Sequence, residues 1–244
     1  MNKILILLLG SLIVPLSSAA LGEEQILSIT PQKPKLGEPI VITYNSGAKN
    51  ALLREGKTII AEVLLLGVSE EVLRLELPMN QTGSFWSCTF RIDDENARLM
   101  LLRFISAGKT DDNDKNAWDF QLYGVDGKPL ENSHLQRASI LQSTDISSFK
   151  RKKDLIAAKA ELAQEKILYP DNWRASIALW GLWMSESPGD ETKAKIATEL
   201  KDLCEARPDD EEMMVEGLKW FEKIGQPQKA NEIVKSAITI RPKG

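Results

Sequence analysis

Three proline-containing dipeptides divide the C-terminal part of this sequence into segments of similar length. Tyr169-Pro170, Arg207-Pro208 and Arg241-Pro242 follow one another at intervals of 38 and 34 residues. Proline ends a helix because it lacks a backbone N–H and its ring collides with the preceding turn. Recurrence at this period is typical of stacked helix-turn-helix repeats, which form extended binding surfaces. The spacing therefore predicts a helical repeat region that binds a partner.

Apolar residues at helical spacing predict five helices in this region. The first carries the stripe Ile156, Ala160, Ala163 and Ile167, with Leu155 and Leu162 beside it, which we expect to face the core. The second carries Trp173, Ile177, Trp180 and Met184, widened by Leu179, Leu182 and Trp183, so we expect burial on two sides. Its tryptophans Trp173, Trp180 and Trp183 are the candidate partner-binding residues. They either line a peptide groove or belong to the core, and their helical spacing favours the core.

The other helices have recognisable ends. Ser187-Pro188 is expected to start the third helix, and Asp209, with Glu212 three residues later, to cap the fourth. Gly225 ends the fourth helix and Pro227 opens the fifth.

The last two helices are similar to a tetratricopeptide unit. Phe221 supplies the aromatic residue of that motif, Ala230 and Ala237 are small where two helices approach, and Pro242 ends the unit. Gly217 lies near the expected glycine. The region is therefore expected to consist of tetratricopeptide-like pairs.

The first twenty residues are typical of a secretion signal. Lys3 precedes the apolar run Ile4–Leu16, and Ser18-Ala19-Ala20 offers small residues for cleavage. The run is shorter than the roughly 20 residues that span a bilayer. We expect cleavage after Ala20, a periplasmic or secreted protein, and no stable membrane insertion after cleavage. A retained anchor is the alternative.

Residues 21–147 contain short segments that predict β-strands separated by turns rich in Gly, Asn and Asp. The seven segments are Ile26–Thr30, Pro39–Tyr44, Thr58–Leu66, Val72–Leu77, Ser84–Ile92, Arg98–Ser106 and Ala117–Tyr123. Strands at this spacing, without helical patterns between them, favour a β-sandwich. The stretch Ala61–Leu66, which is apolar apart from Glu62, is expected to be covered on both faces.

Two polar features in this part favour structural roles. The run Asp111–Asn116 offers oxygen ligands for calcium, but Ala117 and Tyr123 occupy positions where an EF-hand needs glycine and glutamate. We interpret the run as a solvated turn, with a calcium site of another kind as the alternative. His134, the single histidine, follows the last strand and is expected at the surface.

The two cysteines, Cys88 and Cys204, lie far apart and neither belongs to a CxxC motif. Unpaired cysteine packs as a small hydrophobic residue, so two buried free thiols are expected. A bridge between the two halves is the alternative in an exported protein.

No set of residues specifies a reaction. GxSxG, HExxH and phosphate-loop motifs are absent, and one histidine cannot form a multi-histidine metal site. Glu161 and Glu165 beside Lys166 are interpreted as a solvated helix face. With 31 basic and 35 acidic residues, the chain lacks the charge of a nucleic-acid binder. The sequence predicts no enzyme, no cofactor, no metal and no nucleic-acid partner.

Aromatic residues of the strand region raise the hypothesis of sugar binding. Trp86, Trp118 and Tyr123 are the candidates for a flat aromatic platform. Alternation along the strands assigns Trp86 and Trp118 to the core, which makes this hypothesis an alternative rather than the leading one.

Several phrases of the sequence resemble a known family. They are Thr30–Asn45, Phe85–Phe90, Asp112–Asn116, Gly124–Leu130 and Tyr169–Asn172. Together they resemble the N-terminal part of exported bacterial proteins related to the TlpA/ResA thiol-disulfide oxidoreductases. The resemblance implies an immunoglobulin-like domain and a helical repeat that precede a thioredoxin-fold domain. This sequence contains no such domain and no CxxC motif, so no redox residue is carried over.

We therefore expect a multidomain α and β protein with a signal peptide at 1–20, an immunoglobulin-like β-sandwich at 21–147 and tetratricopeptide-like helical repeats at 148–244. The leading function is a non-catalytic protein-interaction or scaffold module of the periplasm or cell envelope, with a protein or peptide partner. One alternative is the non-catalytic N-terminal portion of a thiol-disulfide oxidoreductase whose thioredoxin domain is missing. A second is a carbohydrate-binding β-sandwich. The sequence leaves the oligomeric state open.

Overall fold

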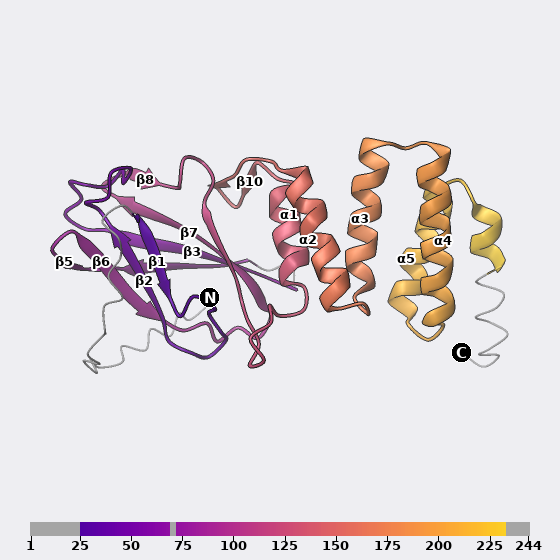
Figure 1. Ribbon diagram of the computed structural model, residues 1–244, viewed down its shortest axis with the longest axis horizontal. Coiled ribbons are helices and arrows are strands. Elements are labelled where there is room, and N and C mark those ends of the chain that lie inside the picture. Colours follow the sequence, from indigo (N-terminus) through magenta and orange to yellow (C-terminus); the bar gives the residue numbers. More distant parts are fainter. Residues whose placement is uncertain (1–24, 69–71, 233–244) are drawn as a thin grey trace, which may run out of the picture.

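The protein combines antiparallel sheets at one end with helices packed side by side towards the other (Figure 1). The computed structural model describes residues 25–68 and 72–232. Within them the fold is mixed α and β, as predicted.

Two antiparallel sheets contain nine strands of the described part. Their orders are β1-β2-β6-β5 and β4-β3-β7-β8, with β9 also paired to β7. The bounds are β1 Leu27–Thr30, β2 Ile40–Asn45, β3 Ile60–Gly67, β4 Leu73–Pro78, β5 Asn80–Thr82, β6 Phe85–Phe90, β7 Ala97–Ser106, β8 Lys109–Asp111 and β9 Trp118–Gln121. All seven predicted strands form. The additional strands β5 and β8 are hairpin extensions too short to show alternation.

One apolar core is shared by the two sheets. Ile42 and Tyr44 from β2 belong to the same buried cluster as Val63 from β3 and Leu102 from β7. Side chains alternate across each strand, so each sheet contributes one face to this cluster. The burial of apolar surface between the sheets is the main stabilising term for this part of the molecule.

The central strand β3 is buried on both faces, as its apolar run predicts. Val63 faces the shared core, whereas Leu64 and Leu66 belong to a second cluster on the outer face. That face is covered by Phe149 of the hairpin β10 (Asp145–Ile146) and β11 (Phe149–Lys150), and by Ile140 of helix α1.

A single carboxylate interrupts the outer face of β3. Glu62 is buried and pairs with Arg74 of β4 and Arg103 of β7. Both guanidinium groups lie over the Phe149 ring, and Arg103 also donates to the Ser148 carbonyl. Two cations compensate the buried negative charge, and they fix the hairpin on the sheet.

The helices of the described part are α1 Ser133–Leu141, α2 Leu155–Leu168, α3 Trp173–Glu186, α4 Asp190–Ala206 and α5 Glu211–Lys223. The first four predicted helices correspond to α2–α5. Helical residues resume at Pro227, as expected, but Ala237 and Pro242 lie outside the described residues. No helix in the described ranges has the length and apolar character that a membrane span requires.

Two predicted helix starts are wrong by a residue or two. Gly189 is the N-cap residue of α4, and Ser187 instead ends α3. The α5 cap is Asp210 rather than Asp209, and its carboxylate accepts from the Met213 N–H at 2.9 Å.

The predicted core stripe of α2 is also wrong. Ile156 and Ile167 are 81% and 68% exposed, and Ala160 and Ala163 between them are exposed as well. The helix instead packs through the opposite face, which carries Ala158, Leu162 and Glu165. This buried face includes the carboxylate of Glu165, so the spacing of apolar residues alone predicted the wrong face of the helix as the core face.

Candidate partner-binding groove

The three candidate tryptophans of α3 occupy different environments. Trp180 is fully buried and donates its indole N–H to Glu199 at 3.0 Å, and Trp173 is buried and donates to Asp210 at 3.0 Å. Both rings belong to the core between α3, α4 and α5. Trp183 is only half-buried, so it is the member of the set that solvent reaches.

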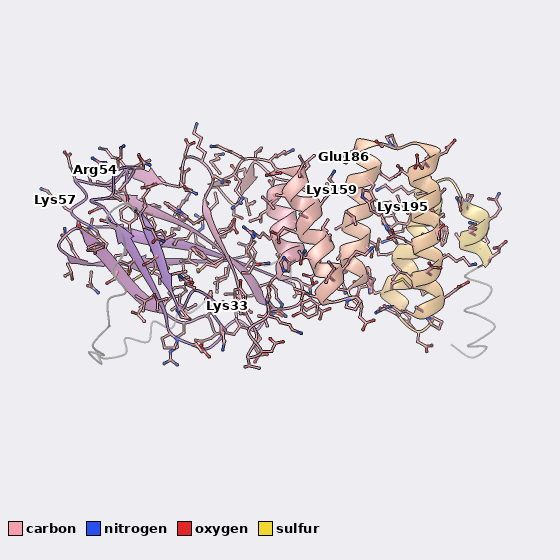
Figure 2. The ribbon with its side chains drawn as sticks, viewed as in Figure 1. Lys33, Arg54, Lys57, Lys159, Glu186 and Lys195 are labelled. Atoms are coloured by element: carbon pink, nitrogen blue, oxygen red, sulfur yellow. The ribbon has the colours of Figure 1, made fainter. Side chains whose placement is uncertain are left out.

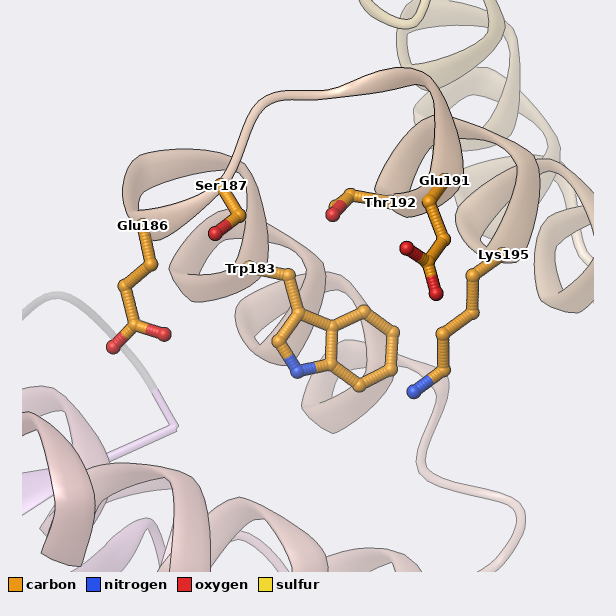
Figure 3. A pocket seen from close by; sticks show the side chains of 6 residues that line it. All are labelled: Trp183, Glu186, Ser187, Glu191, Thr192 and Lys195. Atoms are coloured by element: carbon orange, nitrogen blue, oxygen red, sulfur yellow. The ribbon is translucent and has the colours of Figure 1, made fainter.

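A groove opens beside Trp183 where α3 ends and α4 begins. Its cavity volume is about 230 Å³, and it is lined by Trp183, Glu186, Ser187, Glu191, Thr192 and Lys195 (Figure 3). These residues come together because the short turn after α3 places the first residues of α4 alongside the last turn of α3. Sequence reasoning found Trp183 but missed the other five residues, which show no apolar periodicity.

Charged side chains surround the indole ring of this groove. The Lys195 ammonium lies 3.7 Å from the centroid of the Trp183 ring, which is a cation–π contact. Glu186 at the opposite rim pairs with Lys159 of α2 at 2.9 Å (Figure 2). Glu191 adds a second carboxylate. A flat or cationic side chain of a partner would therefore displace Lys195 to stack on the indole, and it could pair with Glu191 at the rim.

A second, smaller cavity of about 130 Å³ lies where β9 meets α1. Gln32, Asp119, Phe120, Gln121, Tyr123 and Arg137 line it. Asp119 faces Arg137 at 2.8 Å and Arg151 at 2.9 Å, and Arg137 also pairs with Glu161. These charges neutralise one another where β9 meets α1, so the cavity is a structural junction between the sheet and the helices.

The expectation that His134 and Glu165 are solvated is wrong. His134 belongs to α1, and its Nδ1 atom lies 2.5 Å from a carboxylate oxygen of Glu161. Glu165 is fully buried and accepts hydrogen bonds from the backbone N–H groups of Asn132 and His134 and from the side chain of Asn172. A carboxylate from α2 thus caps α1, where the helix dipole favours negative charge.

The acidic run near residue 111 is only partly a solvated turn. Asp111 is buried and accepts hydrogen bonds from the Tyr44 hydroxyl at 2.7 Å and the Leu52 N–H at 3.0 Å. Asn113, Asp114 and Lys115 form an exposed turn with positive φ angles. In the described ranges, no group of three or more His, Cys, Asp or Glu side chains is placed to hold a metal ion.

Both cysteines are buried free thiols, as predicted. They belong to separate clusters, Cys88 between the sheets and Cys204 among the helices. Burial raises the pKa of the Cys88 thiol to about 12 and that of Cys204 to about 11. Each thiol therefore stays protonated and unreactive near neutral pH.

The strand aromatics considered for sugar binding are mostly engaged inside the protein. Trp86 is buried in the core between the sheets, and Trp118 packs edge-on against Phe104 with centroids 5.5 Å apart. Tyr123 is half-buried, with the Lys33 ammonium 5.3 Å from its ring.

Comparison with known proteins gives no relative: the chain matches no family model, no curated protein and no solved structure.

Proposed function

We propose that this chain is an exported, non-catalytic protein-interaction module of the periplasm or cell envelope. In this proposal an immunoglobulin-like β-sandwich is followed by tetratricopeptide-like helix pairs. Two antiparallel sheets around one core support the first assignment, and helices stacked beyond them support the second (Figure 1). The apolar run at residues 4–16 supports export.

The observation that carries the proposal is the half-buried Trp183 ring in an open groove with charged rims. Tryptophan is enriched among the residues that dominate binding energy at interfaces, because a large ring loses water while its edge stays polar. Glu186 on the α3 side and Glu191 with Lys195 on the α4 side suit a peptide segment of mixed charge (Figure 3). The partner in this proposal is such a segment of another envelope protein.

Quantitative affinity capture from an envelope extract of the source organism tests the proposal. The baits are the mature chain, the variant Trp183→Ala, and Val215→Ala as a control at a half-exposed apolar residue of α5. We expect a small set of proteins that the mature chain and the control enrich and that Trp183→Ala loses. Equal capture by all three baits, or no capture above background, would contradict the proposal.

A further inference from the structure

The groove beside Trp183 already holds a cation that belongs to the protein itself. The Lys195 ammonium lies 3.7 Å from the centroid of the Trp183 ring, and both side chains line the groove. Figure 3 shows Lys195 and Glu191 projecting from α4 towards the same end of the indole, with Glu186 on the α3 side. The face of an indole ring attracts cations because its π electrons make it negative. The position of Lys195 therefore marks a cation site on Trp183.

The charges around this site favour a cation from a partner. Of the two carboxylates that line the groove, Glu186 is paired with Lys159. Glu191 is exposed, and within the described residues its carboxylate has neither a hydrogen bond nor an ion pair. The groove also lies at the C-terminal end of α3, where the helix dipole attracts cations, and the last turn of α3 contains no basic residue. The first turn of α4 carries Asp190 and Glu191, which oppose an anion.

We propose that the partner segment is anchored by an arginine, whose guanidinium displaces Lys195 from the Trp183 ring and pairs with Glu191. This inference rests on the proposed function, because it names the residue that the partner places in the groove. The cavity volume of about 230 Å³ is below the roughly 300–1,000 Å³ of pockets that enclose a small molecule, so it suits a single side chain.

Arginine fits the groove better than the other side chains that stack on indole. Its guanidinium is flat, is less strongly hydrated than an ammonium, and pairs with a carboxylate through two parallel N–H groups. It therefore replaces the Lys195 ammonium on the ring, although both groups carry one positive charge. An aromatic side chain would remove Lys195 from the ring without supplying a cation for Glu191.

Lys195 is a competitor of the partner in this arrangement. An arginine binds only after the ammonium has left the indole, so Lys195 lowers the affinity of the groove for arginine. Removal of Lys195 should therefore strengthen binding. The opposite effect is expected if Lys195 itself pairs with an acidic residue of the partner.

NMR titration of the ¹⁵N-labelled mature chain with N-acetyl-arginine amide, at constant ionic strength, tests the proposal. The readout is the indole N–H resonance of Trp183, assigned with the variant Trp183→Phe. We expect a saturable shift in the millimolar range, which is appropriate to one side chain. N-acetyl-citrulline amide has nearly the same shape without the charge, and it should give no saturable shift at this resonance.

Two variants and a matched control test the roles of the charged residues. Lys195→Ala should bind the arginine amide about threefold or more tightly, and Glu191→Gln should bind it about threefold or more weakly. Glu205→Gln, at an exposed residue of the same helix that is paired with Lys201, is the control and should bind like the unmodified chain. Circular dichroism verifies that every variant folds.

Three results would overturn the arginine anchor: no saturable shift at Trp183, an equal response to citrulline, or affinities of Lys195→Ala and Glu191→Gln that do not move in opposite directions. The envelope capture with Trp183→Ala measures the proposed function separately. Captured proteins that this variant loses, without arginine binding, would contradict the arginine anchor alone. Arginine binding without captured proteins would contradict the proposed function and leave the arginine site standing.

Discussion

At the scale of single residues, the least predictable features are buried carboxylates that join distant segments. Glu62 pairs with two arginines of neighbouring strands, Asp111 holds Tyr44 and the Leu52 backbone, and Glu165 caps α1. A buried charge is tolerated only when it is paired or hydrogen-bonded. The hydrogen-bond partners of these carboxylates are far away in the sequence. The local sequence pattern therefore predicted, wrongly, that Glu165 is solvated.

Glu165→Ala should be strongly destabilising. The change leaves buried N–H groups of Asn132 and His134 without their acceptor, which costs about 1–3 kcal/mol for each such group. We expect the free energy of unfolding, measured in urea, to fall by about 3 kcal/mol. Glu205→Ala, at an exposed residue paired with Lys201, is the control and should change it by less than about 0.5 kcal/mol. A loss equal to that of the control would show that Glu165 does not cap α1.

The Cys88 thiol should make the protein less stable at alkaline pH. Its pKa is about 12 in the folded protein, against 9.0 as the reference value for an exposed thiol. Above pH 9 the unfolded chain releases this proton and the folded protein keeps it, so stability is lost as pH rises towards 12. The slope is about 1.4 kcal/mol per pH unit for one group.

Urea unfolding at pH 8 and pH 10 checks this expectation. The decrease between the two pH values should be about 1.4 kcal/mol larger for the unmodified chain than for Cys88→Ala, which has no thiol to ionise at this position. Equal decreases in the two proteins would contradict the buried, protonated thiol.

At the scale of elements, alternation and helical spacing identified which segments form strands and helices, but not every packing face. β3 was predicted correctly because its run Ala61–Leu66 is apolar at every position except Glu62. Helix α1 was missed because it is short and polar, and because its N-cap residue Asn132 makes no capping bond. The carboxylate that caps α1 comes from Glu165 of α2, so the sequence of α1 itself contains no capping residue that would predict where the helix begins.

Two glycines should respond oppositely to alanine. At Gly67, where β3 changes register against β7, an added Cβ would collide with the backbone carbonyl of Asn96. At Gly181, inside α3, the added Cβ meets nothing within 4 Å. We expect Gly67→Ala to destabilise by about 1–3 kcal/mol and Gly181→Ala to stabilise by about 0.5–1 kcal/mol. Thermal unfolding measures both, and the same sign for both would contradict the packing described around them.

At the scale of the whole molecule, polar contacts tie the sheets to the helices. Arg151 after the β10–β11 hairpin binds Asp119 of β9, and the Tyr169 hydroxyl donates to the Pro129 carbonyl. The groove at Trp183 lies where α3 ends and α4 begins, and Figure 1 shows these two helices on the far side of α1 and α2 from the sheets. Sequence periodicity located the right helix for the candidate site. It could not separate Trp183 from Trp173 and Trp180, because exposure depends on how α4 and α5 cover α3.

We propose that the groove beside Trp183 engages a protein partner in the cell envelope. Site-specific photo-crosslinking in living cells tests it most directly, with a photoreactive amino acid at Thr192 in the groove and, as a control, at exposed Lys219 of α5. We predict discrete adducts from position 192 that disappear when Trp183→Ala is added, and none of these from position 219. The same set of adducts from positions 192 and 219, or adducts from position 192 that persist with Trp183→Ala, would contradict this proposal.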